Sequence, residues 1–282
     1  MLISYSQFTR ETISALYFNI SEPNDLSYIK QKTSKYAHLV EKYIMLKTRG
    51  DEPVIKLLDR YINEWSLYNN SDPVLRWAKR IRQEYSNYVV DATPCPMINR
   101  FEVTSNNNII DILQNRRSIR RFTEQSIEHD KLEQLIEAAN WAPTSCNRQP
   151  LKYLFVKDPE LKKQLSATIS GGKLFAHNAA VILLVLADKR GYRFGEERFT
   201  PYQDSAAAIQ NILLTVEYLR LGACWCTYTS YSSISDESGV RRMLKIPNRF
   251  LICGAIAIGY SAQTVCEVSR GKPEYYIDTF LE

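Results

Sequence analysis

The stretch Asn115-Arg-Arg-Ser-Ile-Arg-Arg-Phe122 decides how the fold of this chain is interpreted. Its last seven residues hold four arginines and one serine. In an extended segment successive side chains alternate between two faces, so Arg116, Ser118 and Arg120 would point the same way. Two guanidinium groups beside a hydroxyl form a good receptor for a phosphate or another compact anion. Taken alone, however, the stretch fits a solvated basic turn after a helix better than a binding site.

The composition indicates a globular protein with an ordinary core. The chain has 282 residues, of which 45% are hydrophobic and 24% charged, and a net charge of +5. Such a mild charge does not require nucleic acid and agrees with an arginine-lined site for an anionic ligand. We expect a cytoplasmic protein away from the membrane. The N-terminus lacks the basic region and apolar core of a signal peptide, and the longest apolar run is too short to span a bilayer.

The cysteines and histidines predict no metal site. The six cysteines include no Cys-x-x-Cys pair, and only three histidines are present. Cys224 and Cys226 would share one face of a strand, but two thiols alone do not hold a metal. We interpret the cysteines as reduced, small and partly buried residues.

Residues 1–98 are predicted to form a helical extension without a catalytic constellation. Apolar and aromatic residues recur there at helical spacing. The periodic blocks cover residues 26–46, 54–65 and 73–88. Ser71 or Asp72 can cap the third helix, and Pro73 fits its first turn. We interpret the extension as a module packed on the main domain, with a lid or a partner-docking surface as the functional alternative.

Residues 99–282 alternate helices with a few strands, which is typical of an α+β or α/β sandwich. Ser126 is expected to open a helix that Pro143 ends, and a long helix over 203–221 is expected to end at Gly222. The run Ala179–Ala187 has no polar alternation and predicts a central strand covered on both faces. Other strands are expected at 153–156, 224–228 and 250–260.

Two polar segments of this second part are candidates for ligand contact. Ala142-Pro-Thr-Ser-Cys-Asn-Arg-Gln-Pro150 is dense in hydroxyls and amides, which suit a planar heterocycle or a polyol chain. The charged segment 188–198 suits a mobile loop over a site, and a merely solvated loop explains it equally well.

Four ordered blocks of the chain closely resemble the flavin-dependent nitroreductase family. They are Arg116-Arg-Ser-Ile-Arg-x-Phe122, Ala142-Pro-Thr-Ser-x-Asn-x-Gln-Pro150, Asp204 at the head of an alanine-rich helix, and Leu221-Gly-Ala-Cys-Trp225. Ile246-Pro247, Ala257-Ile-Gly-Tyr260 and a basic tail extend the match over roughly residues 108–280. The resemblance implies an α/β/α sandwich with a mainly antiparallel central sheet and a swapped C-terminal segment. It also implies an intertwined homodimer with two FMN sites at the subunit interface.

The resemblance implies which residues bind FMN. Arg116, Ser118 and Arg120 match the phosphate-binding positions of relatives, and Arg270 and Lys272 fall where the tail adds phosphate contacts. The loop that reaches the flavin and ribityl chain, often from the partner subunit, is matched by Pro143, Thr144, Ser145, Asn147 and Gln149. Thr144 replaces a usual serine but keeps the hydroxyl. Relatives offer a backbone N–H to the reactive flavin nitrogen from a segment that corresponds here to Thr227, Tyr228, Thr229 and Ser230.

The function implied by the resemblance is an NAD(P)H-dependent FMN oxidoreductase. Electrons would pass from NADH or NADPH through FMN to an electron-poor small molecule of nitroaromatic, quinone or enone type, in two half-reactions. No catalytic side chain is expected, because the flavin carries the chemistry. One alternative is an FMN enzyme of the same fold that dehalogenates, dehydrogenates a biosynthetic intermediate or fragments the flavin. Another is a non-catalytic flavin-binding or scaffold protein.

Overall fold

The computed structural model describes residues 26–45, 50–68, 70–91, 108–169, 171–193, 197–226, 228, 234–265 and 268–272. The chain divides into two compact units, one of residues 1–95 and 268–282 (unit 1) and one of residues 96–267 (unit 2). The roles expected for residues 1–98 and 99–282 stay predictions, as does the swapped C-terminal segment. No helix in the described ranges combines the length and apolar character needed to cross a membrane.

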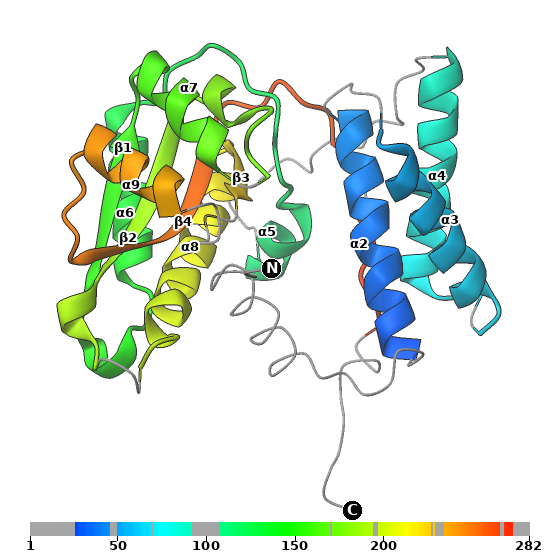
Figure 1. The fold of residues 1–282 in the computed structure, drawn as a ribbon, viewed down its shortest axis with the longest axis horizontal. Helices are drawn as coiled ribbons and strands as arrows, with labels where there is room; N and C mark the ends of the chain where they lie inside the picture. Colours follow the sequence, from blue (N-terminus) through cyan, green and yellow to red (C-terminus); the bar gives the residue numbers. More distant parts are fainter. Residues whose placement is uncertain are drawn as a thin grey trace, which may run out of the picture. The chain divides into compact units, whose positions relative to one another are not determined.

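The part of unit 1 that is described contains three amphipathic helices, which confirms the periodicity in the sequence (Figure 1). They are α2 (Leu26–Met45), α3 (Glu52–Ser66) and α4 (Pro73–Asp91). Their buried faces meet in a core that includes Leu58 and Leu75. Asp72 is the cap of α4, because its Oδ1 accepts hydrogen bonds from the backbone N–H of Val74 at 2.8 Å and of Leu75 at 3.3 Å.

Unit 2 alternates helices with strands. In chain order its elements are α5 (Ile109–Asn115), α6 (His129–Asn140), β1 (Leu151–Val156), α7 (Pro159–Thr168), β2 (Val181–Asp188), α8 (Thr200–Tyr218), β3 (Gly222–Cys226), α9 (Ile234–Met243) and β4 (Phe250–Gly259). The described strands form one antiparallel sheet in the order β1-β2-β4-β3. The predicted antiparallel sheet is therefore confirmed, and β2, the apolar run of the sequence, is an inner strand.

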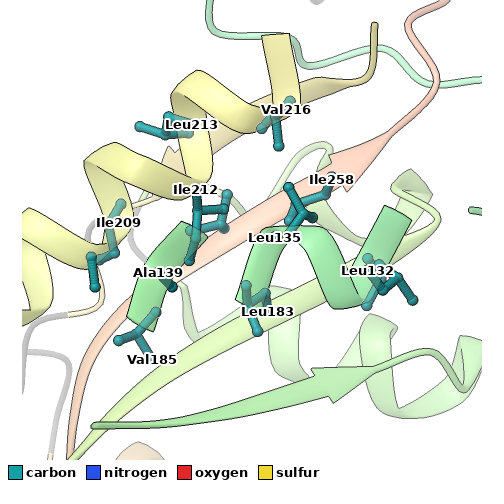
Figure 2. Close-up of a cluster of buried hydrophobic side chains, with 14 of the residues drawn as sticks. Leu132, Leu135, Ala139, Leu183, Val185, Ile209, Ile212, Leu213, Val216 and Ile258 are labelled. Atoms are coloured by element: carbon teal, nitrogen blue, oxygen red, sulfur yellow. The ribbon is translucent and has the colours of Figure 1, made fainter. Parts of the chain in front are cut away.

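Helices pack on the sheet of unit 2 to give the predicted α/β/α layers. Leu135 of α6 and Ile212 of α8 lie with Leu183 and Ile258 in one buried cluster over one face of the sheet (Figure 2). The alternate residues of β2 point to the opposite face and are also buried. On that face Gly172 lies between Ile169, directly after α7, and the Cys226 thiol. Burial on both faces explains why β2 has no polar alternation.

The arginine-rich stretch of the sequence lies along the edge of this sheet. The Ile119 backbone N–H donates to the Ala223 carbonyl at 2.8 Å, and the Thr123 N–H donates to the Tyr260 carbonyl at 2.9 Å. In return the Ala262 N–H donates to the Arg121 carbonyl at 3.0 Å. These bonds attach the stretch to the start of β3 and to the end of β4.

Two glycines make the close approach of this stretch possible. Gly222 and Gly259 face each other directly across β3 and β4. A Cβ on Gly222 would lie 2.8 Å from Ile119 Cγ2, and a Cβ on Gly259 would lie 2.9 Å from Phe122 Cδ1. Any larger residue would therefore push the arginine-rich stretch away from the sheet.

Helix boundaries predicted from the sequence are wrong at the start of α6 and at both ends of α8, which begins at Thr200 rather than 203. Helix α6 begins at His129 rather than near Ser126, because Ile127 packs in the same core cluster as Leu132, in the positions of a hydrophobic staple. Helix α8 is followed by Arg220, which takes the left-handed conformation with φ of 58°. Gly222 is therefore not the helix terminator: it belongs to β3 and accommodates Ile119.

We predict that Gly222→Ala destabilises the protein by about 1–3 kcal/mol, since the new methyl group overpacks against the fully buried Ile119. Urea unfolding followed by far-UV circular dichroism measures this loss. Gly239→Ala is the matched control, because a Cβ there meets nothing within 4 Å and alanine is favoured by up to about 1 kcal/mol inside helix α9. Equal stability of the two variants would contradict the packing described for Ile119.

Candidate functional site

In the arginine-rich stretch Arg116 and Arg120 stand on either side of Ser118 in the sequence. Arg116 and Ser118 are half-buried, whereas Arg120 is only 5% exposed and its guanidinium carbon lies 6.0 Å from the centroid of the Phe175 ring. The expected alternation of faces holds only in part, because the consecutive residues Ile119 and Arg120 are both buried. The stretch is an irregular edge segment rather than a regular strand.

The arginines at the alternate positions have other roles. Arg117 donates through Nη1 to the carbonyls of Gln114 and Arg116, so it caps the C-terminal end of α5 instead of facing only solvent. The Arg121 side chain is exposed, as expected. Neither arrangement directs these two guanidinium groups toward a shared anion with Arg120.

The donor chemistry around Arg120 fits a phosphate group. The Arg120 backbone N–H donates to Gln263 Oε1 at 2.8 Å, which fixes the side-chain amide of Gln263 beside the stretch. The amide nitrogen of Gln263 is buried and has no hydrogen-bond partner among the described residues. Two guanidinium groups, a hydroxyl and this amide are the kinds of donor that bind a phosphate dianion.

The polar loop 143–150 has a strained backbone. Cys146, Asn147 and Gln149 have φ of 52°, 52° and 51°, in the left-handed region that residues other than glycine adopt at a cost of about 1–3 kcal/mol each. Asn147 and Gln149 are exposed, and Gln149 Nε2 donates to Asn147 Oδ1 at 3.1 Å. Of the other predicted loop residues, Pro143 is exposed and Thr144 and Ser145 are half-buried. The loop thus turns its two amide side chains outward.

A buried carboxylate anchors the start of this loop. Asp204, in the first turns of α8, is 6% exposed, and its Oδ1 accepts a hydrogen bond from the Ser145 backbone N–H at 3.0 Å. Its Oδ2 accepts one from the Tyr192 hydroxyl at 3.0 Å. Burial and this bond raise the pKa of Tyr192, so its hydroxyl stays protonated and donates throughout the physiological range. Asp204 belongs to the resemblance, but the sequence assigned it no role.

An ion pair that the sequence did not reveal holds the other end of the loop. Arg148 Nη2 lies 2.5 Å from Glu197 Oε1, and Nη1 lies 2.8 Å from Oε2, so the pair is bidentate. The hydrogen bonds from Arg148 hold the pKa of Glu197 at about 2, well below its ordinary value of 4.5. Glu197 belongs to the charged segment 188–198, whose described residues therefore include a fixed partner of the loop.

The arginine-rich stretch and the polar loop lie at opposite ends of the same sheet. The stretch contacts the end of β4, where Gly259 pairs with Gly222. The loop leads into β1, and the Pro150 carbonyl accepts from the Asp188 N–H, beside the start of β4 at Leu251. Eight residues of strand separate these two points of β4, a distance of about 26 Å. One copy of the chain therefore does not bring the two predicted halves of the site together.

The remaining predicted site residues are placed only in part. Tyr228 is buried, whereas Thr227, Thr229 and Ser230 lie outside the described residues. Arg270 and Lys272 are exposed and belong to unit 1. Their contribution to the site stays a prediction.

The described residues also bear on the metal and cysteine predictions. They contain no cluster of three or more histidine, cysteine or acidic side chains able to hold a metal ion. The cysteines seen among them, Cys146, Cys224, Cys226 and Cys253, form no disulfide with one another. Burial raises the pKa of Cys253 to about 11, so this thiol is not a reactive thiolate.

Comparison with known proteins first defines the class of fold. A protein from Desulfovibrio desulfuricans, assigned as a nitroreductase and solved in complex with FMN, is 29% identical, with a TM-score of 0.53 over 63% of this chain and 100% of the other. The fold is thus that of the nitroreductases. The model of the Nitroreductase family matches residues 113–174 and 170–260, more than half of the chain. The chain belongs to the nitroreductase family, whose members are oxidoreductases.

Two curated relatives agree with this assignment. A protein of Archaeoglobus fulgidus, assigned as an NADH dehydrogenase/NAD(P)H nitroreductase, is 28% identical over 151 residues, which cover 54% of this chain and 84% of the relative. The FMN reductase (NADPH) of Bacillus subtilis is 29% identical over 171 residues, which cover 55% of this chain and 67% of the relative.

The Arg148–Glu197 pair predicts a pH dependence of stability. Because its pKa falls from 4.5 in the unfolded chain to about 2 in the folded one, the Glu197 carboxylate stabilises the fold above pH 4.5. That contribution is lost as the pH falls from about 4.5 to about 2. We expect the difference in melting temperature between the wild type and Glu197→Gln to be constant from pH 5 to 8 and to shrink below pH 4.5. A difference that varies between pH 5 and 8 would contradict the assignment.

Proposed function

We propose that this chain is an NAD(P)H-dependent FMN oxidoreductase that reduces electron-poor small molecules in two half-reactions. The observation that carries the proposal is the attachment of the stretch with Arg116, Ser118 and Arg120, residues of the types that donate to a phosphate, to the edge of a nitroreductase-fold sheet. The names of the relatives support FMN as cofactor and NADH or NADPH as electron donor.

The residues of the arginine-rich stretch and of loop 143–150 suit the two ends of FMN. Arg116, Ser118 and Arg120 would donate to the phosphate. Asn147 and Gln149 would offer neutral donors and acceptors to the flavin ring and the ribityl chain. FMN bound there would supply the redox chemistry of both half-reactions.

The site requires two copies of the chain. The phosphate donors and the amide loop lie about 26 Å apart along β4 within one copy, so a loop from a second copy would complete each site. Exposed apolar side chains that an interface of this kind would cover include Ile109, Ile110 and Leu113 of α5 and Trp141 at the end of α6. We therefore propose a homodimer with two FMN sites.

We predict that the purified protein is yellow, releases FMN on denaturation, and loses affinity for FMN by about 100-fold or more in the double variant Arg116→Ala/Arg120→Ala. Each charge-assisted hydrogen bond to the phosphate contributes about 1.5–3 kcal/mol. Fluorescence quenching of added FMN measures the affinity, and thermal unfolding checks that the variant folds.

Arg121→Ala is the matched control for this experiment, because it removes an arginine of the same stretch whose side chain is exposed. Its affinity for FMN should equal that of the wild type. A colourless protein that also fails to bind added FMN would overturn the proposed function. Unchanged affinity in the double variant would refute only the phosphate assignment.

Steady-state kinetics test the two half-reactions. With NADH or NADPH varied against nitroaromatics, quinones, enones and halophenols, we expect parallel double-reciprocal lines for the true acceptors, since the oxidised nicotinamide leaves before the acceptor enters. The halophenols are included because dehalogenation is an alternative for this fold. Intersecting lines would show that donor and acceptor bind together and would contradict the proposed sequence of events.

A further inference from the structure

We propose that Arg148, held by Glu197, is a positioning residue that keeps loop 143–150 in the strained conformation required to present Asn147 and Gln149 to FMN. This inference rests on the proposed function. It concerns a residue whose own side chain bonds to Ser145, Gly191 and Glu197. Its role is to fix the loop and not to touch the flavin.

The backbone of the loop gives the first part of the argument. Arg148 is in the ordinary right-handed region, with φ of −73°, but Cys146, Asn147 and Gln149 around it are left-handed. Each left-handed residue other than glycine costs about 1–3 kcal/mol, so the segment would relax unless other contacts determine its conformation. The contacts of Asn147 and Gln149 are local, to each other and to Thr144. The restraint has to come from elsewhere.

Arg148 supplies that restraint through its whole guanidinium group. Its Nε donates to the Ser145 carbonyl at 3.0 Å and its Nη2 donates to Ser145 Oγ at 2.7 Å, which closes the turn around Cys146 and Asn147. Its Nη1 donates to the Gly191 carbonyl at 2.5 Å, and its guanidinium carbon lies 5.6 Å from the Tyr192 ring centroid. These contacts join the loop to residues more than forty positions away in the sequence.

Glu197 is fixed independently of the loop. Its Oε2 accepts a hydrogen bond from the Arg193 backbone N–H at 2.6 Å, so a contact other than the one with Arg148 orients the carboxylate. The side chains of Arg148 and Glu197 are 26% and 21% exposed, so the bidentate pair is largely sheltered from solvent. A sheltered, bidentate pair with one fixed partner can hold a strained loop, which an exposed pair with two mobile side chains cannot.

Asp204 completes the frame from the other side. It binds the Ser145 backbone N–H, while Arg148 binds the Ser145 carbonyl and hydroxyl. Ser145 is therefore held at its nitrogen, its carbonyl oxygen and its side chain. Asn147 and Gln149 follow Ser145 two and four residues later in the chain, and Arg148 lies between them.

The test compares Arg148→Met and Arg148→Lys with the wild type. Methionine keeps much of the length without the donors, and lysine keeps the charge without the bidentate geometry. In the FMN-free protein, hydrogen exchange of the backbone amides at 144–149 should become at least tenfold faster in Arg148→Met and should be intermediate in Arg148→Lys. Exchange in α6, β2 and β4 should be unchanged.

The FMN affinity of Arg148→Met should fall at least tenfold, whereas kcat at saturating FMN should stay within about threefold of wild type, because Arg148 touches no reacting atom. The exchanged pair Arg148→Glu/Glu197→Arg should recover part of the affinity. Arg190→Met is the matched control. Arg190 also forms a bidentate pair, with Asp188, but its side chain bonds to no atom of loop 143–150. In the variant, Asp188 still has Arg249 as an ion-pair partner. This variant should bind FMN like the wild type.

The outcomes separate this inference from the proposed function. If wild-type protein binds no FMN, both fail. If the wild type binds FMN and Arg148→Met binds it equally well with unchanged exchange at 144–149, the positioning role alone is overturned. A uniform rise in exchange throughout unit 2, or a fall in kcat that saturating FMN does not restore, would likewise overturn it in favour of a general structural or a catalytic role.

Discussion

The close approach of the arginine-rich stretch to the sheet is the constraint on which the site depends. Gly222 and Gly259 pair across the two strands, and the absence of both side chains leaves room for Ile119 and Phe122. With these two apolar side chains seated, the backbone of the stretch bonds to β3 and to the end of β4. Arg116, Ser118 and Arg120 are then carried at the sheet edge by a rigid element. The apolar residues of the stretch thus determine where its polar residues stand.

The second half of the proposed site depends on polar contacts instead. Pro150 is buried at the end of loop 143–150, and the polar contacts that hold the rest of the loop come from Asp204, Arg148 and Glu197. The two halves of the proposed site lie at opposite ends of β4, so they do not form a complete site within one copy. Dimerisation would therefore be part of building the site, and any weakening of the dimer should appear as weaker FMN binding.

Much of the fold was predictable from the sequence because its signals are local. The apolar run of β2, the periodic stripes of α2 to α4 and the cap at Asp72 each follow from neighbouring residues. Gly222 was misinterpreted because a glycine after a helix is a typical terminator, and only the structure shows Ile119 above it. The Arg148–Glu197 pair was also missed, because only the three-dimensional structure brings the two residues together. Its partners are 49 positions apart, and no local pattern joins them.

The left-handed backbone at Asn147 and Gln149 lowers the stability of the folded chain. Glycine adopts φ near 50° without the clash that a Cβ causes, so a sequence optimised for stability alone would place glycine at 147 and 149. After the loss of chain entropy is counted, each replacement would gain roughly 0.5–1 kcal/mol. Such a chain would be more stable but would have no side-chain amide at 147 and 149 to contact the flavin. In any thermostabilisation of this enzyme, these two positions are therefore the ones where a more stable variant should be expected to be a poorer flavoprotein.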